Sequence, residues 1–283
     1  MSAPDGTQSS VTPILYEQHM HTPLCKHAIG DPGEYAYIAQ RRGLKGIVVT
    51  CHNPIPDGYS PRVRMYPNEF PKYVDLVARD RRDWAGKIDI RLGIESDYSP
   101  GMEPYLEKFH QSAEFHHVLG SVHPQIGEYQ TKYYTGDVFA FQQTYFTHLA
   151  MAAETKLFDT LSHPDLVKNC HPSKWDLNRI MDHIRACLDR IAKAGTAMEL
   201  NTSGLHKDIE EMNPGPRILK EIQLRGIPMV VGADAHVPNR VAADFEQAYD
   251  LLTEAGFTHV HIFLDRKRQA IAIKDARASL KPL

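Results

Sequence analysis

The sequence has few cysteines, and they do not stand close together. Its four cysteines, Cys25, Cys51, Cys170 and Cys187, are widely scattered and form no CxxC pair. Such spacing argues against a disulfide framework and against a zinc knuckle built from thiolates. We therefore expect reduced thiols in a cytoplasmic protein.

Long apolar runs and an excess of basic charge are also missing. No apolar run approaches the ~20 residues that a membrane helix needs, so we expect no membrane partner. Residues 1–10 are small and polar, without the basic and apolar regions of a signal peptide, and we expect residues 1–12 to form a disordered leader. The net charge of −3 gives no indication of a broad basic surface that binds nucleic acid.

Linkers and repeats are missing as well, which bears on the number of domains. The 283 residues contain no Gly/Ser/Pro-rich linker and no internal repeat. Hydrophobic residues make up 42% and charged residues 24%, as in an ordinary soluble globular protein. We expect one domain over residues 13–283, with a core large enough for a (β/α) barrel.

Short β-rich runs alternate with longer helical patterns through most of the chain. Strands are predicted at 14–16, 46–50, 88–94, 117–122, 158–162, 196–200, 228–231 and 259–264. Helices are predicted at 33–42, 68–84, 137–156, 176–194 and 214–226, with one more before residue 259. This repeated order of β then α is typical of a parallel sheet covered by helices. Seven or eight such units in one unbroken stretch favour a closed α/β barrel over an open sheet.

Histidine is the compositional anomaly, with 16 copies, and many of them follow predicted strands. In a (β/α) barrel the carboxyl ends of the strands form the functional face. The strand ends carry, in chain order, His19 and His21, His52, Glu95, His123, His163, Asn201, Asp234 and His236. A single histidine at a strand end is commonplace, but six strand ends that finish in metal-binding residue types indicate one site. His27 joins them because it lies in the first loop, six residues past His21.

Other histidines lie away from strand ends. We interpret the ones within predicted helices or strands as structural: His110, His116, His148, His183 and His261. The pattern leaves His117, His171 and His206 undecided.

The candidate ligands are nitrogen and carboxylate oxygen atoms without thiolates. This donor set suits Zn²⁺, Mn²⁺ or Fe²⁺. Because zinc takes about four ligands, nine candidates fit two or three ions, with a carboxylate such as Glu95 bridging a pair. Two metals about 4 Å apart can clamp the attacking and leaving oxygens of a phosphoryl transfer, and a hydroxide bridging them supplies the nucleophile. No serine, cysteine or histidine nucleophile is then required, and we interpret Thr22 and Cys25 as residues that pack beside the ligands.

These residues occur in a set of short motifs that is specific as a whole. HMHT with HA six residues on, TCHN, GIESDY, GSVHP, SHPD and GADAH follow one another in this order. The set resembles the polymerase and histidinol phosphatase (PHP) superfamily, over roughly residues 17–263. Within that superfamily, residues 65–123 look most like the monofunctional histidinol-phosphate phosphatases.

The resemblance implies a distorted (β/α)7 barrel, similar to a TIM barrel, that holds three metal ions. By position, the first metal's ligands are His19, His21, Glu95 and Asp234. The second metal's ligands are Glu95, His123 and His163. The third metal's ligands are His27, His52 and His236. In the family pattern the ELNTSG stretch borders the substrate, so the resemblance also makes Asn201 and Ser203 candidate substrate contacts.

A phosphate monoester carries a second negative charge, which calls for cations in the loops near the metals. The candidates are Arg62, Arg64, Lys168, Lys207 and Arg240. A water molecule or Asp165 is the candidate proton donor to the leaving alkoxide. Residues 127–134 and 210–214 depart from the usual histidinol phosphatase pattern, at places where an imidazole head group would sit.

The sequence therefore predicts a metal-dependent phosphatase in which a metal-bridging hydroxide attacks a small phosphomonoester, with L-histidinol phosphate as the first substrate implied. One alternative is a phosphodiesterase or a nucleotide or sugar phosphatase with the same centre. Another is a non-catalytic metal-binding accessory module, although such a module would typically lack some ligands. A metal-dependent amidohydrolase would more often show a carboxylated lysine at a strand end. The metal's identity and the oligomeric state stay open.

Overall fold

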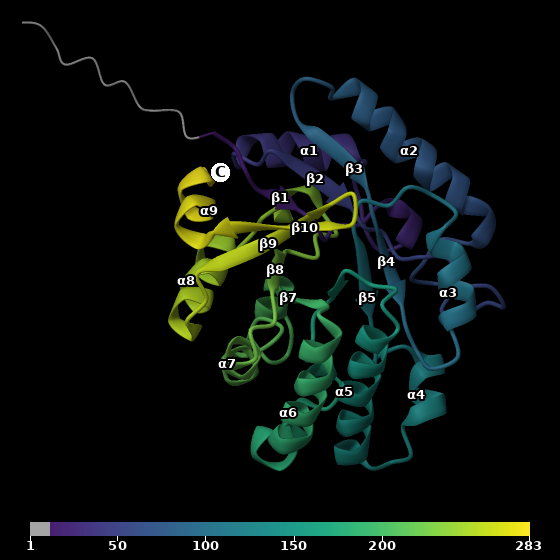
Figure 1. Cartoon of the computed structure of the whole chain (residues 1–283). Coiled ribbons are helices and arrows are strands. Elements are labelled where there is room, and N and C mark those ends of the chain that lie inside the picture. Colours follow the sequence, from purple (N-terminus) through teal and green to yellow (C-terminus); the bar gives the residue numbers. More distant parts are fainter. Residues whose placement is uncertain (1–11) are drawn as a thin grey trace, which may run out of the picture.

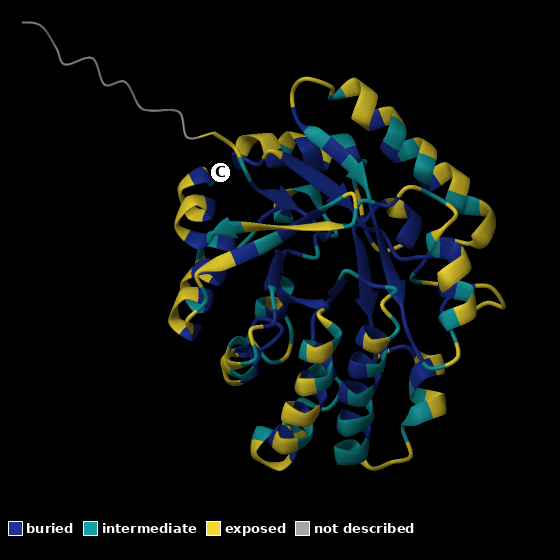
Figure 2. Ribbon diagram, in the orientation of Figure 1, coloured by how far each residue is buried: buried dark blue, intermediate teal, exposed yellow. Residues whose placement is uncertain are grey.

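The structure is a computed structural model and describes residues 12–283. The predicted leader, residues 1–12, lies outside the described residues except for Thr12. Short parallel strands occupy the centre (Figure 1). They are β1 (Tyr16–Glu17), β2 (Gly46–Val49), β3 (Asp89–Leu92), β4 (Ile94–Asp97), β5 (Val118–Ser121), β6 (Thr160–Leu161), β7 (Ala197–Asn201) and β8 (Met229–Gly232). Figure 2 shows these strands as a mostly buried interior.

The strands form two parallel sheets, in the orders β1-β2-β3 and β4-β5-β6-β7-β8. Gly93 separates β3 from β4, but its N–H donates to Val49 O and Glu95 N donates to Cys51 O, so β3 and β4 follow β2 and the residues just after it as one strand in two pieces. A Cβ atom at Gly93 would lie 2.9 Å from His117 O, closer than real Cβ contacts, which explains the glycine. With β3 and β4 counted as one strand, β1 to β8 form seven consecutive parallel strands.

The two outer edges of this arrangement meet beyond β1 and β8. Met20 and Ala235 form a parallel bridge, with Ala235 N donating to His19 O at 3.0 Å and His21 N donating to Ala235 O at 2.9 Å. Directly after β1, the Gln18 side chain instead bonds the backbone of Phe263 through both its amide atoms. The fold is therefore a distorted (β/α)7 barrel, as the sequence predicted.

Helices cover the outside of the barrel (Figure 1). They are α1 (Pro32–Arg41), α2 (Phe70–Asp83), α3 (Glu103–His110), α4 (Gly127–Tyr133), α5 (Val138–Glu154), α6 (Leu177–Ala194), α7 (Pro216–Leu224), α8 (Phe245–Ala255) and α9 (Ile273–Ser279). In α6 the residues Ile180, Ile184, Leu188 and Ile191 are buried, which is the helical spacing that predicted it. Asp176 caps its first turn, and Gly195 ends it in a left-handed conformation, φ 76°.

The predicted strand at 259–264 exists, but its expected place in the β/α pattern was wrong. β9 (His259–Leu264) pairs antiparallel with β10 (Lys267–Ala272) in a separate hairpin. Asp265 and Arg266 connect them with positive φ of 52° and 60°, the conformation of a tight two-residue hairpin turn. Such a turn leaves no chain for the crossover that a parallel partner requires. The short helices α3, α4 and α9 were not predicted either.

Within residues 12–283, none of the helices combines the length and the apolar character that spanning a membrane requires.

Candidate metal centre

The nine predicted ligands converge at the carboxyl end of the barrel, around the carboxylate of Glu95. Glu95 lies on β4 and is fully buried. Its Oε1 lies 3.0 Å from His163 Nε2 and 3.5 Å from the Nε2 atoms of His19 and His123. The ends of β1, β5 and β6 thus deliver three candidate ligands to one oxygen atom of Glu95 on β4.

The second oxygen of Glu95 faces two further imidazoles. Oε2 lies 2.8 Å from His52 Nδ1 and 3.6 Å from His21 Nε2. The carboxylate of Asp234, just beyond β8, contacts two of the same imidazoles. Its Oδ1 lies 3.0 Å from His21 Nε2 and 3.5 Å from His19 Nε2. A carboxylate with imidazoles on both oxygens has the placement of a bridging ligand.

His27 and His236 complete the set at the outer edge. Their Nε2 atoms lie 2.9 Å apart, and the His236 ring stacks on His21 with centroids 4.0 Å apart. The His27 ring also stacks on His52, at 5.4 Å between centroids. His27, exposed in its loop, therefore lies beside candidate ligands that follow β1, β2 and β8.

Two of these residues have an unfavourable backbone conformation. His163 has φ 30° and Asp234 has φ 51°, both in the left-handed region that favours glycine. Non-glycine residues adopt it at a free-energy cost, and such strain gathers at functional sites. Just past their strands, the His163 side chain reaches Glu95 and the Asp234 side chain reaches His19 and His21.

Unpaired polar atoms at this site also indicate that it binds metal ions. Among the described residues, several buried nitrogen and oxygen atoms at this site have no hydrogen-bond partner. They are His19 Nε2, His21 Nδ1 and His163 Nδ1, together with His52 Nδ1 and Glu95 Oε2, which lie 2.8 Å apart but are not oriented for a hydrogen bond. Leaving such atoms without a partner is costly, and imidazole and carboxylate are the ligands that Zn²⁺ and similar ions accept.

The distances group the donors into overlapping sets, in each of which the ligand atoms lie within 4.8 Å of one another. Three of these sets are His19–His21–Glu95, His19–His163–Asp234 and His21–His52–His236. They overlap with the three ligand sets implied by the resemblance without matching them in every member.

Charge at the site follows from burial and neighbours. Burial alone raises the pKa of Glu95, but His52, His19 and His123 more than offset it and hold that pKa well below its usual value. Burial lowers the pKa of His52 to about 3, although Glu95 opposes it. Burial, with His21 nearby, also lowers the pKa of His236 to about 3. A charged Glu95 and neutral His52 and His236 are the forms that bind metal ions.

A cavity of about 990 Å³ opens over the centre. Seven candidate ligands line it: His27, His52, Glu95, His123, His163, Asp234 and His236. The opposite wall comes from residues 60–64 and from α4 with the residues before it. Arg62, Arg64 and Lys207, three of the five predicted cations, line the cavity, and so does Lys132, which was not among them.

Arg64 also forms a buried ion pair with Asp97, next to the candidate metal centre. Its side chain is buried, and Nη2 donates to Asp97 Oδ2 at 2.7 Å. Asp97 Oδ1 in turn lies 3.0 Å from His123 Nδ1. Arg64 therefore holds the carboxylate that orients a candidate ligand.

Asp165 and Lys168 are not among the residues that line the cavity. The Asp165 carboxylate accepts hydrogen bonds from Asn213 Nδ2 at 2.5 Å and Gly215 N at 2.9 Å, and Lys168 Nζ lies 3.1 Å from it. Lys168 also donates to Met212 O at 2.9 Å. This network holds residues 212–215, and both charged groups are bonded there rather than at the cavity wall.

Three other predicted contacts also point elsewhere. Arg240 donates to Asp244 Oδ2 at 2.9 Å and does not line the cavity. Ser203 Oγ lies 2.7 Å from Asn201 Oδ1 and 3.3 Å from Asp234 Oδ2. Ser203 therefore contacts one candidate ligand, Asn201 reaches it only through Ser203, and neither residue lines the cavity.

Sequence reasoning missed two buried carboxylates that bond the outer nitrogens of candidate ligands. Asp97 lies on β4 beside His123, and Glu199 on β7 lies 2.7 Å from His19 Nδ1. Each stands two residues along a strand from a residue that was singled out, Glu95 or Asn201, and so faces the same side. That alternation was the available signal.

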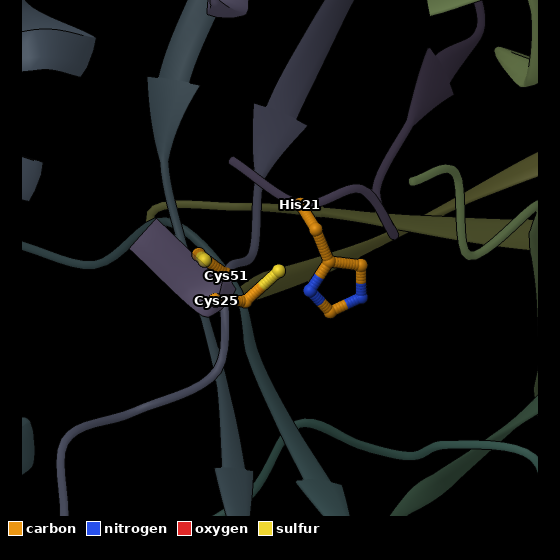
Figure 3. Close-up of side chains that lie close together, drawn as sticks. All are labelled: His21, Cys25 and Cys51. Atoms are coloured by element: carbon orange, nitrogen blue, oxygen red, sulfur yellow. The ribbon is translucent and has the colours of Figure 1, made fainter. Parts of the chain in front are cut away.

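Two thiols lie beside the candidate ligand His21. Figure 3 shows Cys25 and Cys51 beside the His21 ring, and Thr22 Oγ1 lies 3.2 Å from Cys51 Sγ. Both cysteines are buried and free. Thr22 and Cys25 thus pack next to His21.

A model of the PHP domain matches residues 17–203, two thirds of the chain and most of the strand ends described above. The chain belongs to the PHP domain family. A Deinococcus radiodurans protein named "Probable histidinol-phosphatase" is 35% identical, with 90% of this chain and 98% of that protein covered. The "Histidinol-phosphatase" of Bacillus subtilis is 26% identical, with 83% and 97% covered.

A solved structure shares the same PHP fold. It is the histidinol phosphate phosphatase of Lactococcus lactis complexed with zinc, L-histidinol and phosphate. The TM-score is 0.75 at 20% identity, with 90% of this chain and 98% of that chain covered.

Proposed function

We infer that this PHP protein is a metal-dependent phosphatase that hydrolyses L-histidinol phosphate to L-histidinol and phosphate. The observation that carries this conclusion is Glu95, whose two carboxylate oxygens face five imidazoles at the base of an open cavity. The substrate follows from the relatives. Two relatives that match 90% and 83% of the chain are named as histidinol-phosphatases, and the related Lactococcus lactis structure holds L-histidinol and phosphate.

The nine convergent residues would hold two or three divalent ions, with zinc, manganese and iron as the candidates. We propose His19, His21, Glu95 and Asp234 for the first ion. We propose Glu95, His123 and His163 for the second ion. We propose His27, His52 and His236 for the third ion. When bound, such ions lower the pKa of water and offset negative charge on phosphoryl oxygens.

The chain's own residues supply positioning around that centre. Arg62, Lys132 and Lys207 line the cavity, and within residues 12–283 they form no salt bridge. We propose that these cations bind the non-bridging phosphate oxygens, because charge-assisted hydrogen bonds to phosphate are among the strong ones. Because Asp165 is bound to Asn213 and Gly215, a water molecule remains as the proton donor to the leaving alkoxide.

The test is phosphate release from L-histidinol phosphate by purified protein with Mn²⁺ or Zn²⁺, with EDTA as the control. Nucleotides, sugar phosphates and bis(p-nitrophenyl) phosphate complete the substrate panel, and His123→Ala runs beside the wild type. We expect metal-dependent release from histidinol phosphate that His123→Ala abolishes. Turnover of another ester alone would refute the substrate, and metal binding without any hydrolysis would refute the enzyme.

We also propose that the chain forms one domain over residues 13–283 and works in the cytoplasm. The second proposal is supported by four free cysteines, three of them buried, as in proteins from reducing compartments.

A further inference from the structure

Glu199 is a fully buried carboxylate that touches two candidate ligands of different metal ions. It lies on β7. Its Oε1 lies 2.7 Å from the His19 side chain, at Nδ1. Its Oε2 accepts a hydrogen bond of 2.9 Å from the backbone N–H of His163. His19 and His163 lie 180 and 36 positions away in the chain, so the folded barrel creates this arrangement.

The barrel leaves space for this carboxylate between β1, β7 and β8. Gly232 ends β8, opposite Asn201 of β7. A Cβ atom built on Gly232 would overlap Glu199 Oε1 and would lie 2.8 Å from His19 Cβ. Any side chain at this position would therefore press on the Glu199–His19 pair. The absence of a side chain at Gly232 thus leaves the space that Glu199 occupies.

The contact with Glu199 determines which nitrogen of His19 is free. An ionised carboxylate only accepts hydrogen bonds, so His19 Nδ1 carries the hydrogen. The lone pair then lies on Nε2, which is 3.5 Å from both Glu95 Oε1 and Asp234 Oδ1. Nε2 is also one of the buried atoms without a hydrogen-bond partner. This is the arrangement in which a carboxylate orients a metal-binding histidine.

The second oxygen acts on the backbone of His163. That residue has φ 30°, a conformation that costs free energy outside glycine. Its N–H donates to Glu199 Oε2, which compensates part of that cost where the chain turns His163 toward Glu95.

The contacts of Glu199 extend to a third candidate ligand. Asn201 Nδ2 donates to Glu199 Oε2 at 2.9 Å. Asn201 Oδ1 accepts from Ser203, whose hydroxyl lies 3.3 Å from Asp234 Oδ2. One buried carboxylate thus reaches ligands proposed for both ions that share Glu95.

We propose that Glu199 is a positioning residue for the metal centre: it selects the tautomer of His19 and fixes the backbone of His163, and so couples the first and second metal sites. This inference rests on the proposed metal centre. It predicts that loss of the carboxylate weakens the binding of both ions, while substrate binding to the fully loaded enzyme is unchanged.

The test is the metal affinity of Glu199→Gln, measured by competition of Mn²⁺ or Zn²⁺ against a chromophoric chelator. Glutamine keeps the size of the side chain but cannot accept at both terminal atoms. We expect the dissociation constant to rise about 10- to 100-fold for two ions. At limiting metal kcat falls, excess metal restores much of it, and KM for histidinol phosphate stays at the wild-type value. Glu199→Asp, which keeps the charge, should retain intermediate affinity.

The matched control is Asp159→Asn, just before β6 at the opposite end of the barrel. The half-buried Asp159 carboxylate accepts from Val118 N at 2.8 Å and pairs with Arg266, so it is bonded to a backbone N–H and a side chain as Glu199 is, away from the centre. We expect this variant to lose stability and to keep wild-type metal affinity. Gly232→Ala is the second variant: it keeps Glu199 but fills its space, and it should weaken metal binding as well.

The outcomes separate this inference from the proposed function. If the wild type binds metal and Glu199→Gln binds it with equal affinity and stoichiometry, Glu199 has no positioning role. If Glu199→Gln and Asp159→Asn lose affinity in proportion to the stability they lose in thermal unfolding, the role is merely structural and the proposal is overturned. A wild type that binds no metal overturns the proposed function together with this inference.

Discussion

Replacing Arg64 with methionine tests the ion pair behind the metal centre. Arg64 is about 1% exposed and Asp97 about 2%, and Arg64 Nη2 lies 2.7 Å from Asp97 Oδ2. Arg64 Nη1 also donates to Asn53 O at 3.0 Å. Burial raises the pKa of Asp97, but Arg64 and then His123 more than offset it and hold that pKa below its usual value. Arg64→Met removes the largest of these favourable charges.

Removing one partner of a buried ion pair leaves the other charge without compensation. The cost is typically about 3–5 kcal/mol of unfolding free energy. We expect a loss of this size for Arg64→Met in urea unfolding of the metal-free protein at pH 7. The folded pKa of Asp97 lies below its unfolded value of about 3.8, so the pair's contribution is present above pH 4 and is lost as the pH falls below it. The difference between wild type and variant should therefore shrink below pH 4.

A double-mutant cycle provides the control. Asp97→Asn removes the charge that Arg64→Met leaves behind, so the double variant should be less destabilised than the sum of the single variants. Arg64→Lys keeps a charge but cannot reach both Asp97 and Asn53, and should lie between the wild type and Arg64→Met. The reasoning is refuted if Arg64→Met costs under about 1 kcal/mol, or if the two single effects simply add.

Four further predictions follow from the same structure. Removing metal with EDTA should lower the thermal midpoint, because an ion at 100 times its Kd contributes about 2.7 kcal/mol; an unchanged midpoint would contradict the proposed centre. Lys132→Ala should raise KM for the phosphomonoester about tenfold, equal to about 1.4 kcal/mol, without changing the thermal midpoint, since Lys132 lies exposed on the cavity wall. Asp165→Asn should lower stability but keep kcat in steady-state assays, and a lost kcat would return Asp165 to the reaction. Burial lowers the pKa of His110 from 6.5 to about 3, so the free energy of unfolding should fall as the pH drops from 6.5 toward 3. His110→Gln should reduce this fall by up to ~1.4 kcal/mol per pH unit, as measured by urea unfolding at a series of pH values.

The sequence by itself was sufficient for the barrel and for the candidate ligands. Each parallel strand is marked by its own buried run, and the ends of such strands meet on one face whatever their order around the barrel. His123 could therefore be singled out by following its strand, without knowledge of its neighbours. The same argument placed Glu95 and Asp234 near it, and in the structure His123 lies 3.5 Å from Glu95, while Glu95 and Asp234 each lie 3.5 Å from His19.

The hairpin of β9 and β10 shows where pattern reasoning ends. A buried strand in this hairpin has the same apolar composition as a barrel strand, so its sequence does not reveal its partner. The tight turn at Asp265 and Arg266 decided the antiparallel pairing. Gln18 then bonds this hairpin where β1 and β8 are apart, a contact over 245 positions.

The roles of charged residues were decided by tertiary structure alone. Arg64, Lys168 and Asp165 all stand near motif residues in the sequence, and each could have pointed toward substrate or away from it. The side chain of Lys168 is buried against Asp165, whereas Arg64 lies between the cavity and Asp97. Such choices depend on contacts between loops that the folded barrel brings together.

Glu199 shows the same limit most clearly. What the chain determined locally was which residues end its strands and which of them can bind metal. Which carboxylate stands behind each ligand depended on the neighbours of β7, and on the space that Gly232 leaves open 33 residues further along the chain. Residue type and strand position are local properties, but hydrogen-bond partners across a barrel are not, because they exist only once the strands are side by side.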